Sequence, residues 1–420
     1  MIKEIYKDKF IKNNAAFFIG TMIISVLTYL YHPILGRMMN IDAFGEVQAL
    51  ISLIAIFGVI LGIYRIIIVN IVSNSVNMQE KQEIITVLKK WGLIFVIIVS
   101  LFIIIFSNNF KNFLNFRSPY PFICLAILLL ISFISSIRSS ILHGLQDFKS
   151  VSIMGIIITF SRLVFAVFLV YLGWSAFGAI IALVIAEILG LLYVFYKTRN
   201  RLTLFIDTKV KLSKGIKKEF KYGLLVMVVT LCITFFYSAD VIIVKHYFIS
   251  EQAGAYSGIA TIARIVFFIT GSVTGVLLPS IKINDVDKEN RKTLLKAGFL
   301  LVGVGGIVLL IFFVAPEFAI NLLLGGRYIE YAFLLPKLTF LLFIVSIINL
   351  IFFYYLALRK YFLIYIAIIS PLIILLLTYF RHDSMSQIIN NFLLVNFLVI
   401  IYLFFRLLLK NFFKPDLVKV

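Results

Sequence analysis

Two arginines lie deep inside long apolar runs, where a charged side chain needs a specific reason to be present. Arg162 and Arg264 each stand about eleven residues into a run, roughly 16 Å along a helix that rises 1.5 Å per residue. A guanidinium group stays charged at such a depth and offers a planar fork of donors that matches phosphate and carboxylate oxygens. The two residues therefore indicate either buried ion pairs or a binding site for an anion.

Two carboxylates are candidates for partners of these cations. Glu187 lies near the middle of the run that follows the run of Arg162, so a structural Arg162–Glu187 pair is possible. Asp240 lies roughly 6 Å nearer the outer side than Arg264, which leaves Arg264 without an acidic residue at its own depth. We expect Arg264 to contact a substrate, and Asp240 to be its partner or a coupling site.

Other polar side chains lie nearer the ends of the runs. Arg65 and Arg138 near the inner side, and Lys245 and Lys337 near the outer side, can extend their long side chains to the head groups. Arg65, Arg138 and Lys245 also remain candidates for substrate contacts. An interfacial aromatic belt, or stacking on a sugar, would explain the tyrosines near the outer ends: Tyr29, Tyr31, Tyr237, Tyr247 and Tyr256.

The runs that position these residues fill most of the 420-residue chain, which is 62% hydrophobic and 14% charged, with a mean hydropathy of +1.09. A helix needs about 20 apolar residues to cross a bilayer. The composition predicts an all-α polytopic membrane protein. Twelve transmembrane helices are expected, at residues 14–38, 46–72, 91–107, 119–143, 151–172, 175–196, 220–247, 253–279, 295–315, 333–357, 361–380 and 386–409.

The net charge of +20 is distributed unevenly between the two sides of the membrane. Most of the 39 lysines and arginines fall on the side that holds both termini and the basic 197–221 segment. Because cytoplasmic loops carry the excess of Lys and Arg, both termini are predicted to be cytoplasmic. The same placement excludes nucleic acid as an expected partner, since these charges serve topology and anionic lipids. The opposite side has Arg37, Lys111, Arg117, Arg327 and Arg381.

The chain is expected to consist of two halves. A basic cytoplasmic linker at 197–219 separates an N-terminal six-helix bundle, 1–196, from a C-terminal one, 220–420. Since six is an even number, both halves would enter the membrane from the same side, with a substrate site between them. A shift of 209 residues aligns three residues of the first half with three of the second: Asp42, Gly45 and Gly62 with Glu251, Gly254 and Gly271.

Four segments have patterns that can be compared with a known family. They are ILGRMMNIDAFGEVQALISLIAIFGV (34–59), HGLQDFKS (143–150), SADVIIVKHYFISEQAGAYSGIATIARIVF (238–267) and LLPSIK (277–282). Together they resemble polysaccharide-export and O-antigen flippases of the Wzx type, within the multidrug/oligosaccharidyl-lipid/polysaccharide (MOP) exporter superfamily. Asn40 stands where a proline is expected in that family, a departure that concerns the first turn only.

The resemblance implies a MATE-like fold and a specific transport function. Such flippases move undecaprenyl-pyrophosphate-linked oligosaccharide, the repeat unit of O-antigen, lipopolysaccharide or capsule, from the inner to the outer leaflet of the bacterial cytoplasmic membrane. A cationic central cavity would lower the cost of desolvating the pyrophosphate, because charge-assisted hydrogen bonds to phosphate are strong. The expected partners are membrane lipids and the polysaccharide polymerase machinery.

Two alternative functions are also considered. A cation-coupled multidrug exporter of the same superfamily would need acidic residues, and Glu187 and Asp240 are the ones at depth. A polytopic polysaccharide polymerase or ligase would need a large external loop, whereas every loop here is short. The chain has no P-loop, GxSxG or GxGxxG motif, so a transporter is predicted rather than an enzyme. Its scattered Cys and His residues predict no metal site or cofactor.

Overall fold

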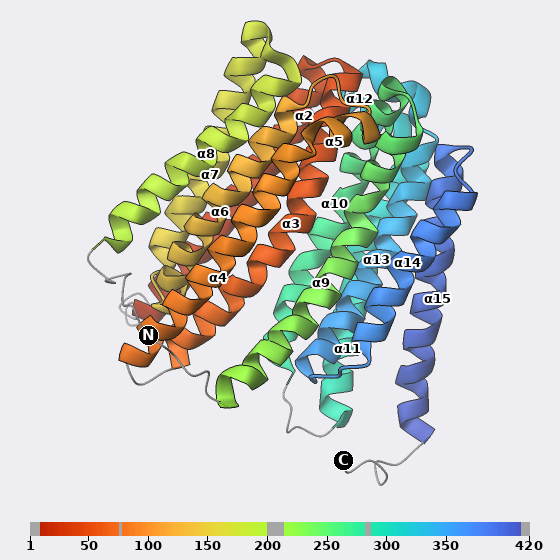
Figure 1. Cartoon of the computed structure of the whole chain (residues 1–420). Helices are drawn as coiled ribbons and strands as arrows, with labels where there is room; N and C mark the ends of the chain where they lie inside the picture. The colour runs from red at the N-terminus through yellow and green to blue at the C-terminus, as the bar shows by residue number, and fades with distance from the viewer. Residues whose placement is uncertain (1–8, 75–77, 200–213, 282–286, 413–420) are drawn as a thin grey trace. The chain divides into compact units, whose positions relative to one another are not determined.

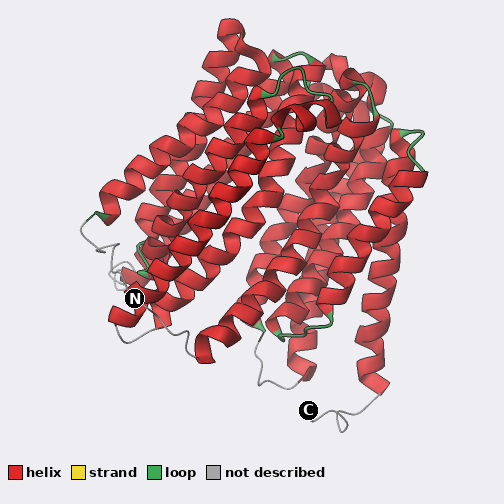
Figure 2. Cartoon of the chain, in the orientation of Figure 1, coloured by secondary structure: helices red, strands yellow, loops and turns green. Residues whose placement is uncertain are grey.

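The computed structural model describes residues 9–74, 78–199, 214–281 and 287–412, and within these ranges it consists of helices and loops (Figures 1 and 2). Every predicted apolar run lies on a long helix, which confirms the all-α prediction. The long helices are α2 (Lys9–Met38), α3 (Ile41–Asn74), α4 (Met78–Ile105), α6 (Tyr120–Gly144), α7 (Phe148–Leu169), α8 (Ser175–Thr198), α9 (Lys214–Tyr247), α10 (Ser250–Ser280), α11 (Asp287–Val314), α13 (Leu334–Ala357), α14 (Leu363–Phe380) and α15 (Met385–Phe412). The short ones are α5 (Ser107–Phe113), η1 (Val170–Trp174), α12 (Pro316–Leu323) and η2 (Gly326–Tyr331).

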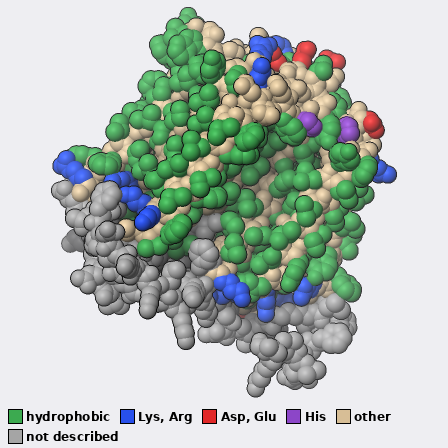
Figure 3. Space-filling model, in the orientation of Figure 1, with side chains coloured by type: hydrophobic (Ala, Val, Ile, Leu, Met, Phe, Trp, Pro, Cys, Tyr) green, Lys and Arg blue, Asp and Glu red, His purple; other side chains and the backbone are tan. Residues whose placement is uncertain are grey.

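The described residues include eleven helical stretches that are long and apolar enough to cross a membrane. One of these, Phe148–Thr198, is 51 residues long and contains both α7 and α8. Hydrophobic side chains cover the middle of the visible helices, while charged groups gather near their ends (Figure 3). The chain is therefore a multi-pass membrane protein. The number of twelve crossings and the cytoplasmic termini stay predictions.

Two turns around α7 follow directly from the local sequence. At its start, Gln146 adopts a positive φ of 59°, and the Asp147 carboxylate accepts the backbone N–H of Ser150 at 3.2 Å. Aspartate is a favourable N-cap because it satisfies a donor that has no partner within the helix. At its end, Gly173 has a φ of 88°, which glycine adopts without a steric penalty, and the chain reverses into α8. The predicted break between these two helices is confirmed.

The contacts divide the chain into two compact units. Unit 1 comprises Met1–Met227 and Phe248–Gly258, and unit 2 comprises Val228–Tyr247 and Ile259–Val420. The helical segments around the predicted linker are longer than expected, since α8 extends to Thr198 and α9 already begins at Lys214. The proposed division into bundles 1–196 and 220–420 stays a prediction.

In unit 1, α7 packs closely against α2 and α8, and α6 packs against α3, α4 and α8. Small residues make the first of these contacts possible. A Cβ on Gly155 of α7 would lie 2.4 Å from Ile24 of α2, and a Cβ on Gly190 of α8 would lie 2.4 Å from Ile158 of α7. In a bilayer, helix association depends on such close packing because lipid tails are as apolar as the helices. The packing fixes the elements that carry Tyr31, Arg162 and Glu187.

In unit 2, α13 is the central helix, with α11 and α15 packed against it and α14 packed against α15. The hydroxyl of Thr270 on α10 donates to that of Ser346 on α13 at 2.9 Å, which links α10 to this group. The outward side chains of α11 are strongly exposed, including Phe299 at 83% and Val314 at 78%. Exposed apolar surface of this kind is expected to contact lipid.

The bounds of several helices repeat along the chain with the shift of 209 residues. Helices α2 and α9 end at Met38 and Tyr247, and α3 and α10 begin at Ile41 and Ser250. Helix α4 spans 78–105 and α11 spans 287–314, so both of their ends obey the same shift. The short helices α5 and α12 begin at 107 and 316. The regularity extends the three aligned residue pairs to a repeat of whole elements.

One aligned pair of glycines makes a direct contact inside unit 1. A Cβ on Gly45 of α3 would lie 2.5 Å from the Gly254 Cα of α10, and a Cβ on Gly254 would lie 2.1 Å from the carbonyl oxygen of Ile41. Nearby, the Ser250 hydroxyl donates to the Asn115 carbonyl oxygen at 3.1 Å. The start of α10 is therefore held against the start of α3 by backbone proximity that only glycine permits.

We predict that Gly254→Ala lowers the stability of the purified protein, because the added methyl group meets backbone atoms that cannot rotate away. Overpacking of this kind costs about 1–3 kcal/mol. Gly58→Ala is the matched control, since nothing lies within 4 Å of its added Cβ. Thermal unfolding in detergent should show a lower Tm for Gly254→Ala only. Equal Tm values for both variants would contradict this account of the contact.

Candidate functional site

The deep arginine of unit 1 stacks on an aromatic ring. The Arg162 guanidinium on α7 lies over the ring of Tyr31 on α2, with its Cζ 4.8 Å from the ring centroid. The Tyr31 hydroxyl donates to the Ala179 carbonyl oxygen of α8 at 3.3 Å, which fixes the ring. The Nε and Nη2 atoms of Arg162 are buried and have no hydrogen-bond partner among the described residues. Arg162 thus has buried donors that no described residue satisfies.

The predicted Arg162–Glu187 ion pair is not formed between these described residues. Glu187 on α8 lies beside the hydroxyl groups of Ser132 and Ser135 on α6. Its charge and that of Arg162 influence each other, yet the two groups do not come within ion-pair distance. The guanidinium turns to the Tyr31 ring instead, because a cation–π contact also stabilises a desolvated cation.

The deep arginine of unit 2 has a different environment. The Arg264 Nη2 lies 3.3 Å from the Asp240 Oδ1, and its Nε donates to the Tyr237 carbonyl oxygen at 2.8 Å. Both side chains are buried, with 6% of Arg264 and 4% of Asp240 exposed. Asp240 therefore pairs with Arg264, which was one of the two roles expected for it. The offset along the helix axis is bridged because an arginine side chain is long and α9 and α10 lie side by side (Figure 1).

The remaining candidate cations differ in how deeply their side chains are buried. Arg138 is held at the end of α8, where it donates to the Thr198 hydroxyl at 2.7 Å and lies over the Phe195 ring. Arg65 is exposed, near His143. Both positions fit side chains that extend toward a helix end. Lys245, in contrast, is fully buried, so the expectation that it reaches the outer head groups is wrong.

Lys337 and the tyrosines predicted near the outer ends differ in exposure. Lys337 is exposed and donates to the Ser386 hydroxyl at 2.6 Å. Tyr31 and Tyr256 are fully buried, so they do not form an interfacial belt. Sequence reasoning missed the role of Tyr31 as the support of Arg162. A signal was present, since an aromatic residue in the first apolar run can face a cation of another run, but spacing along the chain does not reveal which helices touch.

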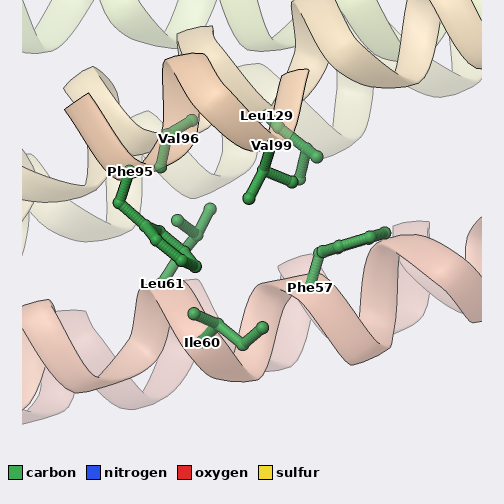
Figure 4. Close-up of a pocket in the computed structure, with 7 residues that line it drawn as sticks. All are labelled: Phe57, Ile60, Leu61, Phe95, Val96, Val99 and Leu129. Carbon is green, nitrogen blue, oxygen red and sulfur yellow. The ribbon is translucent and has the colours of Figure 1, made fainter. Parts of the chain in front are cut away.

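Two cavities in the described residues are lined by apolar side chains. The close-up in Figure 4 shows one between α3 and the helices α4 and α6, lined by Phe57, Ile60, Leu61, Phe95, Val96, Val99 and Leu129. Its free volume is about 20 Å³, enough for one water molecule at most. A larger hollow of about 390 Å³ in unit 2 lies between α11, α13 and α15 and is also apolar. Neither of these two cavities offers a polar group that could bind an anion.

We predict that Asp240→Asn destabilises the protein strongly, because it leaves the buried Arg264 charge without its carboxylate. Breaking one partner of a buried pair costs about 3–5 kcal/mol, whereas replacing both by apolar residues is often neutral. The double variant Asp240→Leu/Arg264→Met should therefore recover much of the lost Tm in detergent. Glu251→Gln, at an exposed carboxylate, is the control. A double variant less stable than Asp240→Asn would refute a mainly structural pair.

Comparison with known proteins identifies the family of the chain. Residues 10–284 match the model of a family described as polysaccharide biosynthesis protein, and all four compared segments fall inside this range. No curated protein matches the chain.

Solved structures resemble the fold over nearly its whole length. The lipid II flippase MurJ in an inward closed conformation matches with a TM-score of 0.74 and 15% identity, covering 93% of this chain and 87% of that one. An inward-facing multidrug resistance MATE family transporter of the MOP superfamily matches with a TM-score of 0.66 and 13% identity, covering 90% and 94%. A MOP superfamily transporter from Pyrococcus furiosus gives 0.58 and 14%, covering 94% and 95%. The family match and this shared fold confirm the predicted resemblance, and the chain belongs to the family described as polysaccharide biosynthesis protein.

Proposed function

We propose that this protein is a flippase for a lipid-linked oligosaccharide, an undecaprenyl-pyrophosphate glycan such as an O-antigen or capsule repeat unit. It would move this substrate from the inner to the outer leaflet of a bacterial cytoplasmic membrane. The family match and the fold shared with a lipid II flippase support a transporter of this kind. Polysaccharide polymerase machinery as a partner, the expected central cavity and both cytoplasmic termini stay predictions.

The observation that carries the proposal is the arginine with free donors in unit 1. A charged residue in a membrane span costs about 2.5–3.5 kcal/mol on insertion scales, so Arg162 needs a compensating interaction. The Tyr31 ring supplies part of it, while Nε and Nη2 have no acceptor among the described residues. A phosphate oxygen pair matches this fork of N–H donors. A pyrophosphate group would thus complete the set of partners that Arg162 lacks.

The chemistry of the substrate fits such a site. A lipid pyrophosphate carries negative charge that must leave water, while its polyprenyl tail can stay in the bilayer. A fixed guanidinium replaces part of the lost hydration through charge-assisted hydrogen bonds. The membrane potential would assist as well, since an anion that leaves a negative interior gains about 2.3 kcal/mol per charge per 100 mV.

Arg264 can take part only in a different way. Its charge is balanced by Asp240 and its Nε is bound to the Tyr237 carbonyl oxygen. To bind phosphate, it would have to exchange the carboxylate for the substrate. Such an exchange would link substrate binding to the α9–α10 contact, and it gives Asp240 the coupling role that we proposed from the sequence.

A cation-coupled multidrug exporter is the second candidate, favoured by the fold shared with MATE transporters. Such a protein would bind cationic drugs or coupling cations through deep carboxylates. Asp240 already pairs with Arg264, which leaves Glu187 beside Ser132 and Ser135 as the available group. Because Glu187 is a single acidic group and the charge of Arg162 is not paired, the site favours an anion over a cationic drug. Deletion of the gene should therefore leave drug sensitivity unchanged, and sensitisation to cationic dyes would favour the second candidate.

We predict that Arg162→Gln abolishes most export, because the neutral amide cannot replace the lost charge. Charge-assisted hydrogen bonds contribute about 1.5–3 kcal/mol each, so the affinity for a pyrophosphate headgroup should fall roughly 10- to 100-fold. In cells, surface polysaccharide should be lost while lipid-linked precursor accumulates on the inner leaflet. In vesicles, flux of a lipid-linked sugar should fall in parallel.

Two further variants sharpen this test. Arg162→Lys should export at an intermediate rate, because lysine retains the charge but lacks the bidentate fork. Lys337→Gln, an exposed cation of unit 2, is the control and should export normally. Normal export by a well-folded Arg162→Gln variant would overturn the proposed role of this arginine.

A further inference from the structure

Equivalent positions of the repeat hold the deep arginines of the two units. The shift of 209 residues aligns Tyr31 of α2 with Asp240 of α9, and each stands seven residues before the last residue of its helix, Met38 or Tyr247. Each also contacts the guanidinium of its own unit: Tyr31 contacts Arg162 and Asp240 contacts Arg264. A cation is thus held at the same place in both repeats.

The two cations themselves come from helices that do not correspond. Arg264 lies on α10, whose counterpart α3 has Ala55 at the aligned position. Arg162 lies on α7, outside the helices whose bounds repeat with this shift. The aligned feature is therefore the holding residue rather than the arginine. Its identity differs between the repeats, an aromatic ring in one and a carboxylate in the other.

This difference decides how much charge each of the two deep arginines retains. The Asp240 carboxylate neutralises Arg264 at 3.3 Å, and the Tyr237 carbonyl oxygen takes its Nε at 2.8 Å. Tyr31 binds Arg162 through its ring face and carries no charge at neutral pH, so it leaves the guanidinium positive and its N–H edge free. Glu187 offsets part of that charge from beyond ion-pair distance.

The Tyr31 ring is also built in rigidly. Its hydroxyl is bound to the Ala179 carbonyl oxygen, and its ring packs edge-on against His32 at 5.6 Å between centroids. The His32 ring is in turn hydrogen-bonded to the Gln48 side chain at 2.9 Å. The Tyr31 ring, held by these contacts, fixes the plane of the Arg162 guanidinium without using any of its donors.

We propose that Tyr31 is a specificity-determining residue, which holds Arg162 in place without neutralising it and so lets Arg162 bind the phosphate of an anionic lipid substrate. The inference rests on the proposed flippase function and deepens it. Tyr31 acts through Arg162 and is therefore a positioning residue. A carboxylate at this position would convert the anion site into an internal ion pair, as Asp240 does in unit 2.

The test compares four replacements in the full-length protein: Tyr31→Phe, Tyr31→Leu, Tyr31→Asn and Tyr31→Asp. The probe is farnesyl pyrophosphate, a short lipid pyrophosphate, whose binding to detergent-purified protein is measured by calorimetry. Asp and Asn have nearly the same shape and differ in charge, so their ratio isolates neutralisation. We expect Tyr31→Asp to bind the probe at least about tenfold more weakly than Tyr31→Asn. Equal affinities of the two would overturn the charge argument.

Phenylalanine and leucine test the ring. Tyr31→Leu removes the ring and should weaken binding several-fold while the Tm stays close to that of the wild type, whereas Tyr31→Phe keeps the ring and should bind normally. If the Asn and Asp variants do not fold, as judged by gel filtration and Tm, the comparison of the Leu and Phe variants decides the proposal. Equal binding by the Leu and Phe variants would refute the role of the ring.

Arg162→Gln separates this inference from the proposed function. If it stops export while Tyr31→Asp binds and exports like the wild type, the inference about Tyr31 fails and the flippase function stands. If Arg162→Gln exports normally as well, the proposed role of the arginine fails with it.

Discussion

A guanidinium group inside a bilayer must find its partners within the protein, because neither water nor lipid head groups reach it. This constraint acts on Arg162 and Arg264, and much of the surrounding structure can be understood from it. Helices α2, α7 and α8 pack closely enough to place Tyr31 beneath Arg162, with the ring fixed through Ala179. Helices α9 and α10 place Asp240 and the Tyr237 carbonyl oxygen around Arg264.

The two solutions have different consequences for binding. An ion pair satisfies both members and leaves little field for a third charge. A cation–π contact stabilises the cation while the edge of the guanidinium stays available. The same fold thus stabilises one deep arginine by an ion pair and the other by a cation–π contact. The cation–π contact is the one suited to a phosphorylated lipid, and this agrees with the membership of the chain in a polysaccharide biosynthesis family.

The repeat of helix bounds explains why such a comparison is possible. Helices α4 and α11 begin and end 209 residues apart, and the short helices α5 and α12 follow them in the same order. Glycines keep part of this framework close, as at Gly254, where a Cβ would meet the Ile41 carbonyl oxygen. The side chains differ at aligned positions, with Tyr31 in one repeat and Asp240 in the other. Packing sets the backbone, and a single side chain sets the charge of the site.

The sequence by itself determined the helices, their approximate bounds and the family, because apolar length and turn residues such as Asp147 and Gly173 act locally. It also located both deep arginines, since depth in an apolar run can be counted along the chain. The sequence also named Asp240 as a candidate partner of Arg264, and the contact between them agrees with it. The tertiary structure alone decided that Arg162 contacts the Tyr31 ring and not Glu187, and that Lys245 is enclosed rather than extended to the surface. Such contacts depend on how neighbouring helices are rotated and spaced, and a pattern along one chain does not encode that in a form that can be read without the fold.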